Sequence, residues 1–340
     1  MTPIIDLRGA DLLRTYRPTI LLLIGIGLAA CHRDGGDSAA KATKPAAGTV
    51  LHLGYQKIGP PFLLKARSET LEARLASLGA RAEWIEFQAG PPLLEAMAAG
   101  AVDIGYVGET PPIFAQAGGV AFVYVASEPP APKAEAILVH ADSPLKTVGD
   151  LRGKRVVLNR GANVHYLLVQ ALKRAGLTPK DIEIVFLAPA DGRLAFESRQ
   201  VDAWAIWDPF LADAEGAGAR VLQNGEGLVD NRLYYVARRE LAEQQPDLVR
   251  AVMAEYRTLS DWQAHHADEV AKILEGSSKI KYDSLLVAER RHAFGIEVIT
   301  PEILAGQQTI ADTFTGLGIL PRAIRVADAV LPRAEYVSAP

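Results

Sequence analysis

Segments with the pattern of a β-strand alternate along most of this chain with segments that have the pattern of an α-helix. Val50–Tyr55 reads as the first strand, and Val102–Val107 is a later strand that follows a helical segment at 91–99. Strands separated by helices predict parallel sheets and an α/β fold. The same rhythm restarts after a proline-rich break at 127–133, and the pattern is mostly helical from about Glu240 onward.

The proline-rich break divides the alternating region into two α/β units, and we expect a ligand cleft between them. The first lobe is predicted to comprise residues 50–130 plus 239–335, and the second lobe residues 131–238, with Tyr234–Ala237 as the strand that leads back out. Further strands are expected at 83–87, 134–139, 156–158, 182–187 and 201–206, and further helices at 68–78, 191–198, 247–265, 267–275, 284–294 and 301–315, with another that Asn163 caps.

The N-terminal segment has the pattern of a secretory signal. A basic stretch with three arginines precedes an apolar run at 19–30, and the run ends in small residues directly before Cys31. The sequence Leu-Ala-Ala-Cys at 28–31 resembles a lipobox, in which the cysteine is lipidated and becomes the new N-terminus. We therefore predict a lipoprotein signal peptide at 1–30 and a flexible tether of small polar residues at 31–49. An ordinary signal peptide with a chance cysteine remains open.

Composition and motifs narrow the classes of function. The 340 residues carry a net charge of −4 with no block of basic residues, which argues against a nucleic-acid partner. Because Cys31 is the only cysteine, a lipidated chain has no thiol for a disulfide, a nucleophile or a metal. The chain contains no G-x-S-x-G, H-E-x-x-H or P-loop spacing. We expect no catalytic residue, cofactor or metal site, and we interpret His265, His266 and Glu269 as a solvated helix face rather than metal ligands.

The candidate binding residues directly follow predicted strands, where ligands of open parallel sheets sit. Several of these positions also begin a helix, and helix starts offer unpaired N–H groups that hold an anion without Lys or Arg. Thr110 and Asn163 are equally consistent with simple helix caps, and Trp204 and Trp207 with packing. The shared position at strand ends favours a site, whose candidate residues are Gln56, Gly108, Glu109, Thr110, Asn163, His165, Trp207 and Asp208.

Several segments resemble the aliphatic sulfonate-binding proteins of ABC importers. The likeness covers about residues 50–320, and its most specific parts are Pro-Pro-Ile-Phe-Ala-Gln-Ala at 111–117 and Trp-Ala-Ile-Trp-Asp-Pro at 204–209. The resemblance implies a two-lobed type II periplasmic-binding fold with two hinge crossings. It implies a monomeric, non-enzymatic receptor in the periplasm or on the outer face of the cytoplasmic membrane, anchored by lipid, that delivers sulfonates to an ABC permease.

Two segments depart from that family pattern, Ile58–Phe62 and Gly108–Thr110. Because the Glu109 carboxylate would repel a bare sulfonate, either it points away or the ligand carries a donor or cationic arm. We expect neutral donors to hold the sulfonate oxygens: Gln56, the N–H groups around Thr110, and Asn163 with its following turn. His165, in that turn, is a further candidate. Trp207 would be an apolar wall for the carbon tail. Glu109 and Asp208 would face that tail, ready to accept from an amine or hydroxyl.

Other functions remain open at this point. On the same fold, the ligand is alternatively another small oxyanion or a thiamine-precursor pyrimidine. A cysteine-dependent pyrimidine synthase is an enzymatic alternative, and the lack of a thiol outside Cys31 argues against it. A sensor that presents its ligand to a receptor is not distinguished from an importer component.

Overall fold

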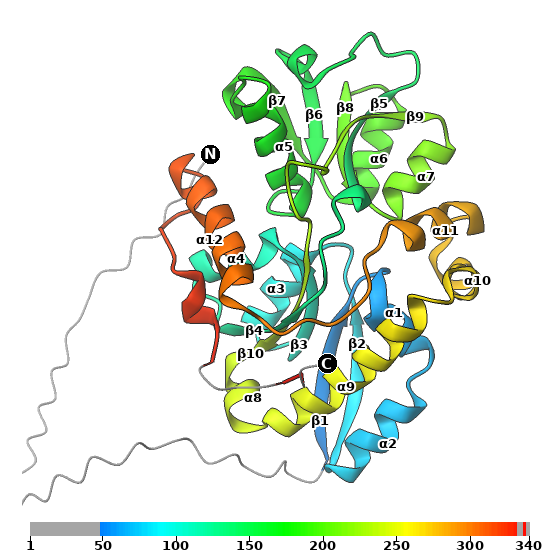
Figure 1. Ribbon diagram of the computed structural model, residues 1–340, viewed down its shortest axis with the longest axis vertical. Helices are drawn as coiled ribbons and strands as arrows, with labels where there is room; N and C mark the ends of the chain where they lie inside the picture. The colour runs from blue at the N-terminus through cyan, green and yellow to red at the C-terminus, as the bar shows by residue number, and fades with distance from the viewer. Residues whose placement is uncertain (1–47, 332–335, 338–340) are drawn as a thin grey trace, which may run out of the picture. The chain divides into compact units, whose positions relative to one another are not determined.

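Two five-stranded sheets organise the chain (Figure 1). A computed structural model describes residues 48–331 and 336–337. The predicted signal segment at 1–30, Cys31 and nearly all of the predicted tether lie outside the described residues. Of that tether only residues 48 and 49 are described, and Thr49 already belongs to the first strand.

The first sheet has the strand order β2-β1-β3-β10-β4. β1, β2 and β3 are parallel, whereas β10 runs antiparallel to both β3 and β4. The prediction of purely parallel sheets is therefore wrong. The reason is that β10 starts where β3 and β4 end, because the chain re-enters the sheet there from the second unit. The strands are β1 (Thr49–Tyr55), β2 (Ala80–Glu86), β3 (Ile104–Gly108), β4 (Phe122–Ser127) and β10 (Leu233–Arg238).

The second sheet has the order β7-β6-β8-β5-β9 and is mixed for the same reason. β6 is parallel to β7 and β8, while β5, which brings the chain in from the first sheet, is antiparallel to β8 and β9. The edge strand β9 was not predicted, since all six of its residues are half-buried and show no alternation. The strands are β5 (Glu135–His140), β6 (Arg155–Leu158), β7 (Glu183–Phe186), β8 (Ala203–Trp207) and β9 (Ala219–Asn224).

Most of the helices lie where the periodicity predicts them. An additional helix, α1, begins at Gly59, because Pro60 and Pro61 occupy its first turn, where a missing N–H removes no helical hydrogen bond. The helices are α1 (Gly59–Ala66), α2 (Glu69–Ser77), α3 (Gly90–Ala98), α4 (Thr110–Gly118), α5 (Asn163–Arg174), α6 (Pro189–Glu197), α7 (Phe210–Gly216), α8 (Arg239–Gln244), α9 (Pro246–Gln263), α10 (Ala267–Ser278), α11 (Tyr282–Arg291) and α12 (Pro301–Gly316).

We call the first sheet with its helices α1–α4, α8, α9 and α12 the first lobe, and the second sheet with α5–α7 the second lobe. The return to the first lobe precedes Leu233, because β10 pairs within the first sheet, so the predicted second-lobe boundary at 238 is too late. The helical tail is not confined to the first lobe either, since α11 packs against α7 (Figure 1). The other predicted domain boundaries remain predictions.

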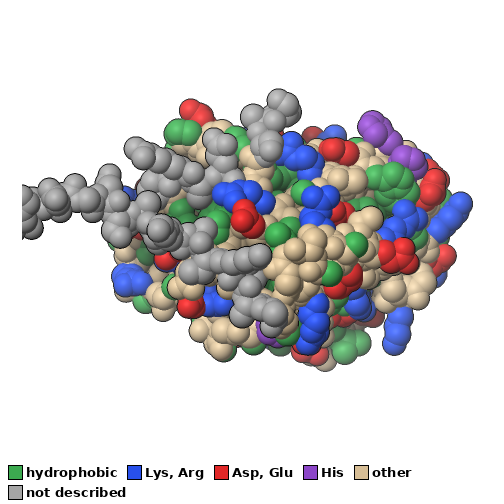
Figure 2. Space-filling model, turned by 90° about the horizontal axis from the view of Figure 1, so that it is seen from below, with side chains coloured by type: hydrophobic (Ala, Val, Ile, Leu, Met, Phe, Trp, Pro, Cys, Tyr) green, Lys and Arg blue, Asp and Glu red, His purple; other side chains and the backbone are tan. Residues whose placement is uncertain are grey.

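The apolar cores continue across the junction of the lobes. One cluster contains Leu93 and Met97 of the first lobe together with Leu167 and Leu172 of the second. In the view from below, acidic and basic side chains are interspersed over the visible surface (Figure 2). Within the described part of the chain, no helix is both long enough and apolar enough to cross a membrane.

Trp204 supports the second lobe from inside its core. It is 1% exposed and packs on Phe196, with ring centroids 5.9 Å apart. We expect Trp204→Ala to lower the free energy of unfolding by about 3–5 kcal/mol, as other large-to-small core changes do. Trp207→Ala, at a half-buried position, is the matched control and should cost clearly less in urea denaturation. Equal losses would contradict this division between the two tryptophans.

Candidate functional site

A small cavity of about 50 Å³ lies between the two lobes, at the ends of their strands. Four residues predicted from the sequence meet in its wall: Gln56 after β1, Gly108 at the end of β3, Asn163 at the start of α5, and Trp207 at the end of β8. The full lining is Gln56, Ile58, Gly90, Gly108, Pro111, Ala131, Ala134, Ala162, Asn163, Trp207, Asn231, Leu233 and His292. We call this cavity the cleft.

The N-termini of α4 and α5 meet in the cleft through one side chain. The backbone N–H of Thr110 donates to Asn163 Oδ1 at 3.2 Å, so a side chain of the second lobe contacts the first turn of α4 in the first lobe. Thr110 and Asn163 are the first residues of their helices, and the side chain of neither caps its own helix. The prediction that Asn163 caps α5 is therefore wrong, because its amide reaches across to α4 instead.

Asn163 is held in this position from two further sides. Its Nδ2 donates to Asn231 Oδ1 at 2.6 Å, and Asn231 in turn donates to the carbonyl of Ala131 at 2.9 Å. A Cβ atom at Gly108 would overlap the Asn163 amide, so the close approach of the lobes requires glycine there. The three contacts bring α4, α5 and both chain crossings to one point.

Gln56 and Trp207 form other parts of the cleft wall. Gln56 is buried, and its Nε2 donates to the carbonyl of Tyr106 at 3.0 Å. Trp207 is half-buried and meets Phe210 edge-on, with ring centroids 6.4 Å apart. Both residues also line an adjoining cavity of about 200 Å³ that extends toward Phe87. The wall beside the helix starts is thus largely apolar.

His292 is a cleft residue that the sequence did not identify. Its Nε2 lies 2.9 Å from Glu128 Oε2, and Glu128 also accepts from the hydroxyls of Tyr106 at 2.6 Å and Tyr235 at 2.7 Å. Burial alone would lower the pKa of His292, but the neighbouring Glu128 outweighs burial and the pKa lies above its ordinary value. A lone histidine after a helix gives no sequence signal, because only the fold brings it beside the hinge.

Two predicted residues lie in other surroundings. The His165 ring is enclosed by Phe114, Phe186 and Phe314, and burial lowers its pKa to about 4, so it is neutral near pH 7. Asp208 Oδ1 accepts from the backbone N–H of Ala212 at 2.9 Å, at the start of α7. Burial raises the pKa of Asp208 to about 7. Neither side chain is part of the cleft lining.

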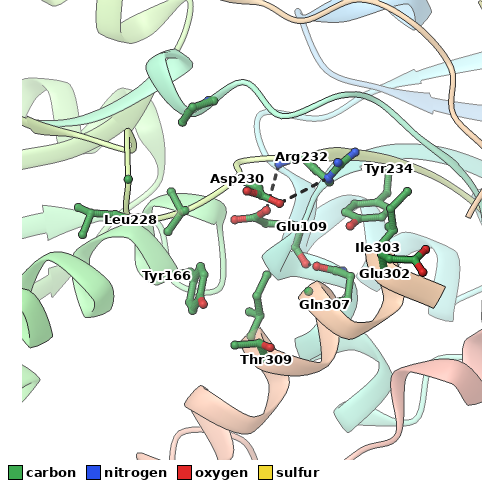
Figure 3. Close-up of a pocket in the computed structure, with 15 residues that line it drawn as sticks. Glu109, Tyr166, Leu228, Asp230, Arg232, Tyr234, Glu302, Ile303, Gln307 and Thr309 are labelled. Carbon is green, nitrogen blue, oxygen red and sulfur yellow. Dashed lines mark hydrogen bonds and ion pairs between the residues drawn. The ribbon is translucent and has the colours of Figure 1, made fainter. Parts of the chain in front are cut away.

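Glu109 points away from the cleft, which is one of the two alternatives left open by the sequence. It is not part of the cleft lining, so the expectation that it faces a ligand's tail there does not match this structure. Its Oε2 accepts from the backbone N–H of Arg232 at 3.0 Å. Its carboxyl lines a separate cavity of about 560 Å³, which we call the rear cavity (Figure 3). Burial raises the pKa of Glu109 to about 8, and the N–H of Arg232 opposes this effect. The Glu109 carboxyl therefore does not face a ligand in the cleft.

The cleft lining contains a few polar side chains among apolar ones. Its polar side chains are those of Asn163, Asn231, Gln56 and His292. Cys31, the only cysteine in the sequence, lies outside the described residues. Over residues 48–331 and 336–337, no three His, Cys, Asp or Glu side chains are grouped so that they could hold a metal ion. The arrangement suits a small ligand that is rich in acceptor oxygens.

Comparisons with known proteins agree with this geometry. Residues 85–269 match the family described as NMT1/THI5 like. An aliphatic sulfonates-binding protein of Escherichia coli (strain K12) is 38% identical over 82% of this chain and 87% of its own, and one of Bacillus subtilis (strain 168) is 30% identical over 92% and 93%. The structure of the alkanesulfonate-binding protein SsuA from Xanthomonas axonopodis pv. citri bound to MOPS superposes with a TM-score of 0.80, at 36% identity, over 85% of this chain and 99% of that one. These relatives are binding proteins and not enzymes.

The buried Glu109 predicts a specific dependence of stability on pH. Its pKa is raised to about 8 in the folded chain, so between its ordinary value of 4.5 and about pH 8 the folded state keeps a proton that the unfolded state has lost. The contribution of Glu109 to stability therefore falls as the pH rises through this window. We expect Glu109→Gln to be about as stable as the parent at pH 5 and more stable at pH 9.

The gain at pH 9 should be on the order of a few kcal/mol, since one pKa unit corresponds to about 1.4 kcal/mol. Urea denaturation at pH 5, 7 and 9 measures it. Asp261→Asn, which removes an exposed carboxylate, is the control and should track the parent at each pH. A Glu109→Gln difference that does not change with pH would show that Glu109 is ionised throughout.

Proposed function

We propose that this chain, which belongs to the family of aliphatic sulfonate-binding proteins, captures an aliphatic sulfonate in the cleft and delivers it to an ABC permease. The observation that carries the proposal is the contact between Thr110 and Asn163. An acceptor oxygen, Asn163 Oδ1, already lies at the first N–H of α4 inside the cleft. A sulfonate oxygen is also an acceptor and would take the same place when the Asn163 side chain turns aside.

The donors around that point fit a sulfonate head. Helix starts carry unpaired N–H groups and partial positive charge, and α4 and α5 both begin at the cleft. Amide groups of Gln56 and Asn163 are available as further donors. His292 lies in the cleft wall with its Nε2 2.9 Å from Glu128 Oε2, and this neighbour raises the pKa of the imidazole despite its burial. A sulfonate carries one negative charge and needs only donors, so this set satisfies it.

The apolar wall fits the carbon tail. Trp207 lies beside the cleft and continues into the adjoining cavity with Phe210 and Ile58. The cleft of about 50 Å³ holds little more than one or two water molecules, which occupy about 30 Å³ each in the liquid. Ligand entry therefore requires the lobes to separate and close again, as hinged binding proteins do.

A ligand panel tests the proposed function. We expect alkyl sulfonates to stabilise the chain against heat, with about 2.7 kcal/mol gained at 100 times the dissociation constant. The panel contains alkyl and aryl sulfonates, taurine, sulfate, nitrate and pyrimidines, in phosphate buffer because common sulfonate buffers would compete. Stabilisation by sulfate or nitrate alone would favour another oxyanion, and stabilisation by pyrimidines alone would contradict the proposal.

In the same panel, Asn163→Ala should weaken every sulfonate similarly, by roughly 1–3 kcal/mol in calorimetry, because a buried oxygen loses its donor. The control is Asn159→Ala, which removes an amide from the same loop outside the cleft lining. An unchanged affinity in Asn163→Ala would place the sulfonate head elsewhere.

The proposal includes the place where the chain works. The signal pattern at 1–30 and the lipobox-like Leu-Ala-Ala-Cys at 28–31 support an anchor of lipid outside the cytoplasmic membrane. A tether at 31–49 would separate the anchor from the lobes, so the anchor and the cleft should be independent.

We expect Cys31→Ser to release the protein from membranes and to leave its fold and ligand affinity unchanged, because the cysteine would be the only attachment point. Fractionation of cell envelopes with and without detergent measures the release. Ser38→Ala, in the same predicted tether, should stay with the membrane fraction. Unchanged membrane association of Cys31→Ser would contradict the lipid anchor.

A further inference from the structure

The chain segments between the two lobes separate the cleft from the rear cavity. Neighbouring residues of these segments, and of the junction between β3 and α4, line different spaces. Gly108, Ala131, Asn231 and Leu233 line the cleft, and Glu109, Pro132, Asp230, Arg232 and Tyr234 line the rear cavity. The rear cavity is therefore a second space at the hinge, and the sulfonate proposal does not use it.

Two unpaired acceptors belong to buried residues in the wall of the rear cavity. Glu109 is 2% exposed and Gln307 is 1% exposed, and within the described structure neither Glu109 Oε1 nor Gln307 Oε1 has a hydrogen-bond partner. Gln307 Nε2 is fully used, because it donates to the carbonyl of Glu109 and to the Tyr124 hydroxyl, both at 2.9 Å. Figure 3 shows the Glu109 carboxyl in the space between Tyr166, Leu228 and α12. A ligand with hydrogen-bond donors would satisfy these two oxygens.

The charge of the lining is negative. Glu109, Asp230 and Glu302 are carboxylic residues, and Arg232 is the only cationic residue in the lining. Arg232 is already engaged, since its Nη1 donates to Glu297 Oε2 at 2.6 Å and to the carbonyl of Glu128 at 2.9 Å. An anion would therefore meet repulsion here, whereas a cation with N–H donors would find two buried acceptors.

The remaining walls are apolar. Leu228 and Val229 come from the segment that leads back to the first lobe, Ile303 and Ile310 from α12, and the Tyr166 ring from α5. The volume of about 560 Å³ exceeds what one ammonium group fills. We infer that the rear cavity binds a small organic ammonium ion, with its N–H groups on Glu109 and Gln307 and its carbon body against Leu228, Ile303 and Tyr166.

Binding of an ammonium ion should be pH-dependent through Glu109. The groups that face or influence its carboxyl are Asp230 and Arg232 on the returning segment, Tyr234 on β10, Tyr166 on α5, Glu135 on β5 and Glu302 on α12. Burial raises the pKa of Glu109 to about 8, and an aliphatic ammonium keeps its charge to about pH 10, as lysine does. The attraction is therefore stronger at pH 9 than at pH 6.5.

Calorimetry with n-butylamine and benzylamine tests the inference on the full chain. Phosphate and borate buffers are suitable because they contain neither an amine nor a sulfonate. We expect both amines to bind, at least threefold more tightly at pH 9 than at pH 6.5. The neutral isosteres 1-butanol and benzyl alcohol should bind at least tenfold more weakly at pH 9.

Two variants remove the site in different ways. Glu109→Gln keeps the size of the side chain and removes its charge, and should weaken the amines at least tenfold at pH 9 and abolish the pH dependence. Gly306→Leu keeps Glu109 and adds a bulky side chain to the cavity wall, where a Cβ meets nothing within 4 Å and leucine favours a helix. It should also weaken the amines at least tenfold. Asp261→Asn, which removes an exposed carboxylate outside the lining, should leave amine binding unchanged.

Competition with 1-butanesulfonate separates this site from the cleft. An amine that binds without displacing the sulfonate, and that is lost in both variants, supports the rear site. An amine that the sulfonate displaces, that binds equally to Glu109→Gln and Gly306→Leu, or that does not bind at either pH would overturn it. The amine titrations and both variants decide the inference even if the sulfonate itself fails to bind.

Discussion

The contact between Thr110 and Asn163 is the point on which the arrangement of the two lobes depends. It joins the first turns of α4 and α5, and it is possible only because residue 108 is glycine. Asn163 is further tied through Asn231 to Ala131, so the helix starts and both chain crossings share one hydrogen-bonded group. The donors of two helix starts are thereby concentrated in a few ångströms at the base of the cleft.

Buried carboxyl groups surround this point, and their placement decides which charges a ligand meets. Glu128 is compensated by His292 and two tyrosine hydroxyls, Asp208 is used at the start of α7, and Glu109 is turned to the opposite side of the hinge. Burial, and secondly the charge of Glu109, raises the pKa of Glu135 well above its ordinary value. The contact of Glu128 with His292, the helix contact of Asp208 and the orientation of Glu109 together leave mainly hydrogen-bond donors at the cleft.

Local patterns predicted much of the fold and part of the site. The periodicity of helices such as α5 and α9, and the strand β3 before Gly108, follow from short segments of sequence. The rule that ligands sit at the carboxyl ends of strands singled out Gln56, Gly108, Asn163 and Trp207, and these four residues line one cavity. The same rule failed for Asp208 and His165, because a position after a strand does not specify which way the side chain turns. It gave no indication of His292, which lies in the helical tail.

The amino-acid sequence by itself determined the α/β class, the division into two units and the resemblance to sulfonate-binding proteins, since these depend on residues that are neighbours in the chain. Tertiary structure decided the mixed direction of the sheets, because strand direction depends on where β5 and β10 enter. It also decided that Asn163 contacts α4 rather than capping α5, and that Glu109 and Asn231 face opposite sides of the hinge. These outcomes depend on contacts between residues 53 to more than 100 positions apart, such as Thr110 with Asn163 and Glu109 with Arg232, which no local pattern contains.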